Sequence, residues 1–161
     1  TPPAGTPMPA FDPHSLPESN ATSYPEPLRA ANRNRWNRRL GDHSGLRNFG
    51  VNLTRIAPGG QSSYRHGHSK QDEFVYVLSG ELVLVTDAGE EVLVAGDSAG
   101  FPAGVRNGHC LQNRSRTDAT FLVAGNRSNE DGGEYSDIDM AFKPGRYTGG
   151  GGYFHKNGSP Y

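Results

Sequence analysis

The chain has 161 residues, enough for one domain with a buried core, and a formal net charge of −1. This near-neutral balance gives no overall attraction to nucleic acid or to a membrane surface, and no apolar run approaches the roughly 18 residues that span a bilayer. A single cysteine, Cys110, excludes an intrachain disulfide, and with the lack of a secretory signal pattern it favours a cytoplasmic location.

Residues 1–45 are predicted to form an extended N-terminal arm. Residues 1–27 are rich in proline and show neither a helical nor a strand period. Residues 28–40 are expected to make a short helix or turn, and they carry five arginines: Arg29, Arg33, Arg35, Arg38 and Arg39. Such a run could bind phosphate, but one basic run in a neutral chain favours a solvated or subunit-facing segment.

Residues 46–125 are predicted to form the folded domain. Short apolar segments alternate there with turn signals such as Pro58-Gly59-Gly60 and Asp87-Ala88-Gly89. The strands are expected at 49–57, 62–68, 74–78, 81–86, 91–94, 108–112 and 120–124. On the strand 74–78, alternation predicts that Val75 and Val77 face inward while Phe74 and Tyr76 face outward. This pattern predicts an all-β barrel or sandwich. Residues 126–161 are polar and glycine-rich and are predicted to be a C-terminal arm that packs on the barrel or on a second subunit.

A histidine pair followed by a glutamate is the clearest chemical signal. His66 and His68 are separated by one residue, so on a strand they would point to the same face, and Glu73 follows after four residues. Two imidazoles and a carboxylate suit a divalent transition metal with positions left open for substrate. Flanking Gly60 and Gly80 favour this interpretation over a chance spacing of surface histidines.

A second block lies downstream and completes a resemblance to a known family. Gly96 is followed by Pro102 and Gly104, and then by His109 and Asn113. Together the two blocks resemble the two sequence motifs of the cupin superfamily, over roughly half of the chain. The runs DEFVYVLSGE and FPAG are similar to those of small bacterial single-domain cupins, a group without one agreed activity.

The resemblance implies a double-stranded β-helix, which is a small antiparallel barrel or jelly roll, with His66, His68, Glu73 and His109 as metal ligands. The usual second motif has its histidine at the position of Asn107, and a shift of two residues to His109 keeps the same strand face. The alternative is three protein ligands with Asn107 as a weak fourth. The expected cofactor is one divalent metal per chain, with Fe(II) favoured and Mn(II), Zn(II), Ni(II), Co(II) or Cu(II) as alternatives.

Other residues around the expected site are assigned from strand alternation. If His66 and His68 point inward, then Ser62 and Tyr64 do so too, which makes Tyr64 a candidate proton donor or a packing residue. Ser62, Arg106 and Asn107 are the remaining candidates for substrate binding, although a solvated loop arginine is the simpler reading of Arg106.

The sequence favours a metal-dependent cupin enzyme that acts on a small molecule, with a non-haem dioxygenase slightly preferred. The alternatives are a non-redox isomerase, lyase or decarboxylase, and a module that binds metal and ligand without turnover. A homodimer is expected by analogy with other cupins, and neither nucleic acid nor membrane is expected as a partner.

Overall fold

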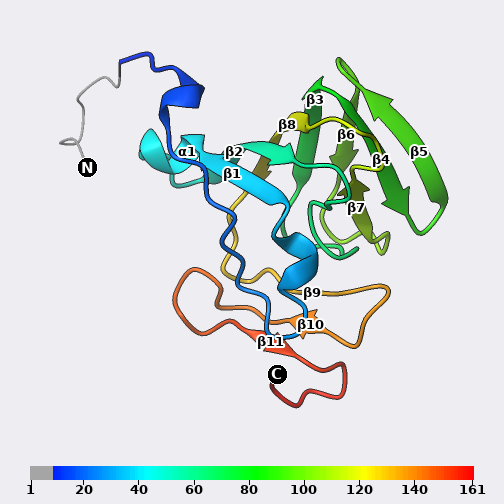
Figure 1. Cartoon of the computed structure of the whole chain (residues 1–161). Helices are drawn as coiled ribbons and strands as arrows, with labels where there is room; N and C mark the ends of the chain where they lie inside the picture. The colour runs from blue at the N-terminus through cyan, green and yellow to red at the C-terminus, as the bar shows by residue number, and fades with distance from the viewer. Residues whose placement is uncertain (1–8) are drawn as a thin grey trace.

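The computed structural model describes residues 9–161 and is built almost entirely of antiparallel strands (Figure 1). The strands are β1 (Arg35–Arg39), β2 (Phe49–Ile56), β3 (Glu73–Ser79), β4 (Glu81–Thr86), β5 (Gly89–Val94), β6 (Ser98–Phe101), β7 (His109–Gln112), β8 (Ala119–Asn126), β9 (Gly133–Glu134), β10 (Ala141–Phe142) and β11 (Tyr153–Phe154). Three short helices are η1 (Pro13–Ser15), η2 (Ala30–Asn32) and α1 (Leu40–His43). The predicted all-β class is confirmed, while residues 1–8 of the expected arm lie outside the described residues.

Residues 9–161 form three sheets. The first has the strand order β1-β2-β8-β3-β6, and the second has the order β5-β4-β7. These two sheets pack face to face as a jelly-roll sandwich. The third sheet, β11-β10-β9, lies below them in Figure 1, and the N-terminal segment runs down to it.

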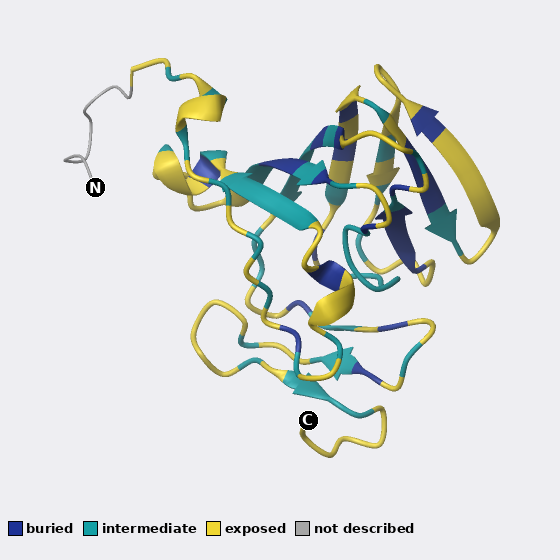
Figure 2. Ribbon diagram, viewed as in Figure 1, coloured by how far each residue is buried: buried dark blue, intermediate teal, exposed yellow. Residues whose placement is uncertain are grey.

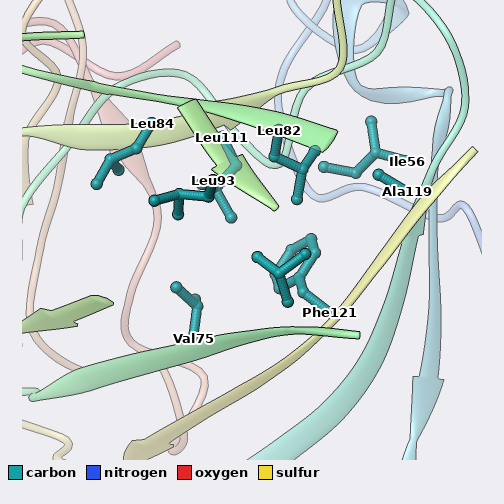
Figure 3. Close-up of a cluster of buried hydrophobic side chains, with 9 residues drawn as sticks. Ile56, Val75, Leu82, Leu84, Leu93, Leu111, Ala119 and Phe121 are labelled. Carbon is teal, nitrogen blue, oxygen red and sulfur yellow. The ribbon is translucent and has the colours of Figure 1, made fainter. Parts of the chain in front are cut away.

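The barrel core fills the space between the two larger sheets (Figure 3). Its nine buried side chains are Ile56, Val75, Val77, Leu82, Leu84, Leu93, Leu111, Ala119 and Phe121. Strand alternation explains this set, because Val75 and Val77 of β3 are about 1% and 0% exposed while Phe74 and Tyr76 are 49% and 39% exposed. The prediction that β3 buries its valines and turns its aromatic residues outward is confirmed. Figure 2 shows the same alternation of buried and exposed residues along the strands.

One predicted strand is wrong, and five strands were not predicted: β1, β6, β9, β10 and β11. Residues 62–68 form a loop that is held by isolated bridges, because its backbone pairs only at single positions rather than along a ladder. The short β6 was not expected, and β1 lies within the segment assigned to the N-terminal arm, paired along its whole length with β2. The placement of the limits between arms and barrel stays a prediction.

The two arms meet in a second hydrophobic cluster, here called the arm cluster. Its buried members are Tyr24, Tyr135 and Met140, and its partly buried members are Leu28, Tyr64, Ile138, Phe142 and Tyr153. Residues from both ends of the chain therefore pack together beside the barrel. Within residues 9–161 we find no helix with the length and apolar character needed to cross a membrane.

Candidate functional site

One cavity of about 770 Å³ has all four expected metal ligands in its wall. It lies against the inner face of the five-stranded sheet, where alternate residues of β1 and β2 reach it. Tyr24, Tyr135 and Tyr153 of the arms form another part of the wall. The site is therefore built by the barrel and by both arms.

The backbone brings His66 beside His109 although 62–68 is not a strand. The His66 amide donates to the His109 carbonyl at 3.2 Å, and the His109 amide donates back to His66 at 3.0 Å. His109 begins β7 and Glu73 begins β3, so the two larger sheets each present one of these side chains at a strand end. The loop is fixed by this pair of hydrogen bonds, and the histidines converge without strand alternation.

The four side chains contact one another inside the cavity. Glu73 Oε1 lies 3.1 Å from His109 Nε2, and Glu73 Oε2 lies 3.7 Å from His68 Nε2. The ring of His66 lies 5.0 Å from that of His68 and 6.0 Å from that of His109, centre to centre. The structure thus gathers His66, His68, Glu73 and His109, as the sequence analysis expected.

Two glycines lie beside Glu73 on the neighbouring strands of the sheet. Glu73 pairs with Gly125 of β8, and Gly125 pairs with Gly50 of β2, so the next two positions across the sheet carry no side chain. The Arg127 guanidinium lies over Gly50, where an added Cβ would be 3.6 Å from its Nε. A Cβ at Gly125 would lie 2.6 Å from the Asp72 carbonyl oxygen, so this position accepts only glycine without a backbone shift.

Hydrogen-bond acceptors beside His66 and His68 determine which ring nitrogen carries a proton. His66 Nδ1 lies 2.7 Å from the Tyr64 carbonyl, and His68 Nδ1 lies 2.6 Å from Asp131 Oδ2. Because a carbonyl or carboxylate accepts, Nδ1 carries the hydrogen in both rings and Nε2 keeps its lone pair. Histidines that bind metals are commonly held in this way.

Burial and neighbouring charges shift the pKa of His66 and that of Glu73. Burial, with the neighbouring His68, lowers the pKa of His66 to about 4, so this imidazole is neutral near pH 7. Burial alone would raise the pKa of Glu73, but the hydrogen bond from His109 and the nearby imidazoles lower it overall. Glu73 is therefore ionised beside a neutral His66.

The donor set fits a divalent metal, although it is not already spaced around one point. Across residues 9–161, no three His, Cys, Asp or Glu side chains stand at the spacing of a bound ion. Glu73 is instead hydrogen-bonded to His109, and the buried Nδ1 of His109 has no partner among these residues. Two free Nε2 atoms, a third imidazole and an ionised carboxylate nevertheless have the chemistry of a transition-metal site.

Asp131 is a site residue that the sequence analysis missed. Its side chain is completely buried, and it accepts hydrogen bonds from His68 and from the amide of Lys70, the latter at 2.9 Å. It lies after β8 in the polar C-terminal segment. No motif marks it, because its role depends on a contact between positions 63 residues apart.

The other candidates lie in different places. Ser62 lines the cavity, and its Oγ accepts from the Leu111 amide at 2.9 Å. Tyr64 packs in the arm cluster and donates to the Leu28 carbonyl at 3.2 Å, and it is not among the described residues that line the cavity. Asn107 is exposed and its Oδ1 accepts from the Asp87 amide at 2.9 Å, while Arg106 is exposed in the same loop. Of the two possible fourth ligands, His109 is the one in the cavity wall.

The comparisons place the chain in a family. Residues 52–125 match the model of the Cupin domain. A sugar phosphate isomerase of the cupin superfamily from Silicibacter pomeroyi is 48% identical, with a TM-score of 0.90, over 95% of this chain and 96% of that one. The chain belongs to the cupin superfamily.

Two further solved structures add to this result. A candidate sugar phosphate isomerase from Acidithiobacillus ferrooxidans is 32% identical over 75% of this chain and 76% of that one, with a TM-score of 0.69. A polyketide cyclase from Streptomyces resistomycificus is 20% identical over 74% of this chain and 79% of that one, with a TM-score of 0.61, and shows likeness of fold alone. No curated protein matches the sequence.

Proposed function

We propose that this chain is a metal-dependent isomerase that acts on a phosphorylated sugar without using oxygen. The relatives at 48% and 32% identity are named as a sugar phosphate isomerase and a candidate for that activity. Their names favour the non-redox alternative over the dioxygenase that the sequence alone slightly preferred. The observation that carries the proposal is one cavity that combines an imidazole and carboxylate cluster with arginines.

The cavity wall suits a sugar that carries an anionic group. Four arginines line it: Arg35, Arg39, Arg127 and Arg146. Asn37, Asn52 and Thr54 lie on the inner faces of β1 and β2 and line it too. Guanidinium groups recognise phosphate, and amide and hydroxyl groups can bind sugar hydroxyls. The wall therefore offers both kinds of group that a sugar phosphate needs.

The metal would be held by His66, His68, Glu73 and His109. When bound, it would supply a Lewis acid that polarises a carbonyl oxygen, and Mn(II) or Zn(II) suit such non-redox chemistry. Burial raises the pKa of Tyr24 to about 12 and also raises that of Tyr135, so both hydroxyls stay protonated near pH 7. They can donate hydrogen bonds to substrate oxygens from the arm side of the cavity.

Isomerisation of an aldose to a ketose moves a proton between neighbouring carbons, which defines the test. The metal-replete full chain is incubated anaerobically in D₂O with phosphorylated and unphosphorylated sugars, and products are followed by NMR. We expect interconversion of a phosphorylated sugar, with deuterium entering at the carbon next to the carbonyl when the moved proton exchanges with solvent. Turnover that requires dioxygen and consumes it would contradict the proposal and restore the dioxygenase.

Metal content is measured independently of activity by elemental analysis. We expect His68→Ala to lose most of the bound metal while it stays folded, and His14→Ala, which removes an exposed histidine, to keep it. We also expect His109→Ala to weaken metal binding far more than Asn107→Ala. The reverse order of effects would make Asn107 the fourth metal ligand.

A further inference from the structure

The four arginines that line the cavity differ in the groups that balance their positive charge. Arg127 Nη2 lies 2.5 Å from one oxygen of Asp42, and Arg39 Nη1 lies 3.6 Å from the other. Arg146 is exposed, and its guanidinium lies 5.7 Å from the centre of the Tyr147 ring. These three groups are therefore paired with a carboxylate or open to water.

Arg35 is in a different environment. It begins β1, and it donates to the Ser62 carbonyl through Nη1 at 2.8 Å and to the Ala21 carbonyl through Nη2 at 3.4 Å. Its Nε is buried and has no hydrogen-bond partner among the described residues. Its neighbours are the neutral side chains of Tyr24, Tyr135 and Tyr153, and partial burial lowers its pKa. Arg35 is therefore a half-buried cation that forms no ion pair with a carboxylate within residues 9–161.

A half-buried guanidinium that has no carboxylate partner favours binding of an anion in the adjoining cavity. Arginine presents a planar set of donors that matches two oxygens of a phosphate. Hydroxyl groups line the same part of the cavity, since Ser23 Oγ and Tyr153 Oη lie 2.8 Å apart and both residues are in its wall. The surroundings of Arg35 thus have the composition of a phosphate site.

We propose that Arg35 binds the phosphate group of the substrate, with the hydroxyls of Ser23 and Tyr153 beside it. This inference rests on the proposed function, from which the sugar part of the substrate is taken. Tyr135 lies between this subsite and the imidazoles, because its ring centre is 5.7 Å from that of Tyr24 and 4.9 Å from that of His66. A short phosphorylated chain would lie along Tyr135, with its carbonyl end at the histidines.

The test measures binding of inorganic phosphate to the metal-replete full chain by calorimetric titration. Arg35→Gln should weaken binding about 10- to 100-fold, because it removes a charge-assisted pair of hydrogen bonds. Arg116→Gln removes the same charge from an exposed loop outside the cavity wall and should bind like the unsubstituted protein. Arg39→Gln tests whether the phosphate binds at Arg39 instead. It should weaken phosphate binding much less than Arg35→Gln.

Unchanged phosphate binding in Arg35→Gln, or a larger loss in Arg39→Gln, would overturn the assignment. If Arg35→Gln does not fold, a crystal structure of the unsubstituted protein grown with phosphate decides. Phosphate within hydrogen-bond distance of the Arg35 guanidinium supports the proposal, and its absence from that position overturns it. Loss of phosphate binding in Arg35→Gln supports the subsite even if no sugar is isomerised, so this test and the test of the proposed function can fail separately.

Discussion

The barrel core and the arm cluster are both buried, but they differ in chemistry. The barrel core consists of aliphatic side chains, alanine and one phenylalanine, and its side chains have no hydroxyl group. The arm cluster is rich in tyrosine, and its rings reach the candidate site: Tyr135 lies 4.9 Å from His66 and Phe142 lies 5.4 Å from His68, centre to centre. The barrel therefore supplies the frame and the four candidate ligands, while the arms supply a polar aromatic wall.

This difference explains how a common fold can acquire its own specificity. The match to the family model covers residues 52–125, which include His66, His68, Glu73 and His109. Asp131, Arg35 and the tyrosines of the wall lie outside that range. The contacts that orient His68 and that would select a substrate thus come from segments added to the barrel.

Leu82→Ala should have the largest effect on stability. Leu82 is completely buried in the barrel core, so its truncation should lower the free energy of unfolding by about 2–5 kcal/mol. Val92→Ala on the neighbouring strand is the control. Because Val92 is 55% exposed, this substitution should change the free energy of unfolding by less than about 0.5 kcal/mol. Urea titration checks both. Equal effects would show that the sheets do not pack around Leu82.

Met140→Ala should loosen the arms and leave the barrel folded. Met140 is also completely buried, but it packs in the arm cluster, so its loss should lower the free energy of local opening by at most about 2–5 kcal/mol. Hydrogen exchange should speed up in β9, β10 and β11 while β3 and β8 stay protected. If β3 and β8 lost protection to the same extent, the arms and the barrel would unfold as one unit.

Asp131→Asn should weaken metal binding about 10- to 100-fold, because it removes the carboxylate that holds His68 by its Nδ1. Asp139→Asn is the matched control in the same segment, since Asp139 is hydrogen-bonded to His155 outside the site. Competition with a chromophoric chelator measures both affinities. Equal metal affinities for the two variants would mean that Asp131 does not position His68.

Several parts of the fold follow from local patterns. The alternation in β3 predicted which of its residues are buried, and the turn at Asp87 and Gly89 predicted the hairpin of β4 and β5. The prediction of a strand at 62–68 was wrong because the alternation of polar residues there is equally compatible with a loop. That loop is held by the paired bonds between His66 and His109, which no local pattern predicts.

The sequence alone determined the all-β class and the cupin resemblance, and it predicted His66, His68, Glu73 and His109 as candidate donors. It could do so because alternation, turn glycines and ligand spacing are local properties of the chain. The tertiary structure decided that Tyr64 packs in the arm cluster, that Asp131 holds His68 and that Arg35 is half-buried beside tyrosines of both arms. These features depend on contacts between distant segments, and burial and charge pairing exist only after those segments have packed together.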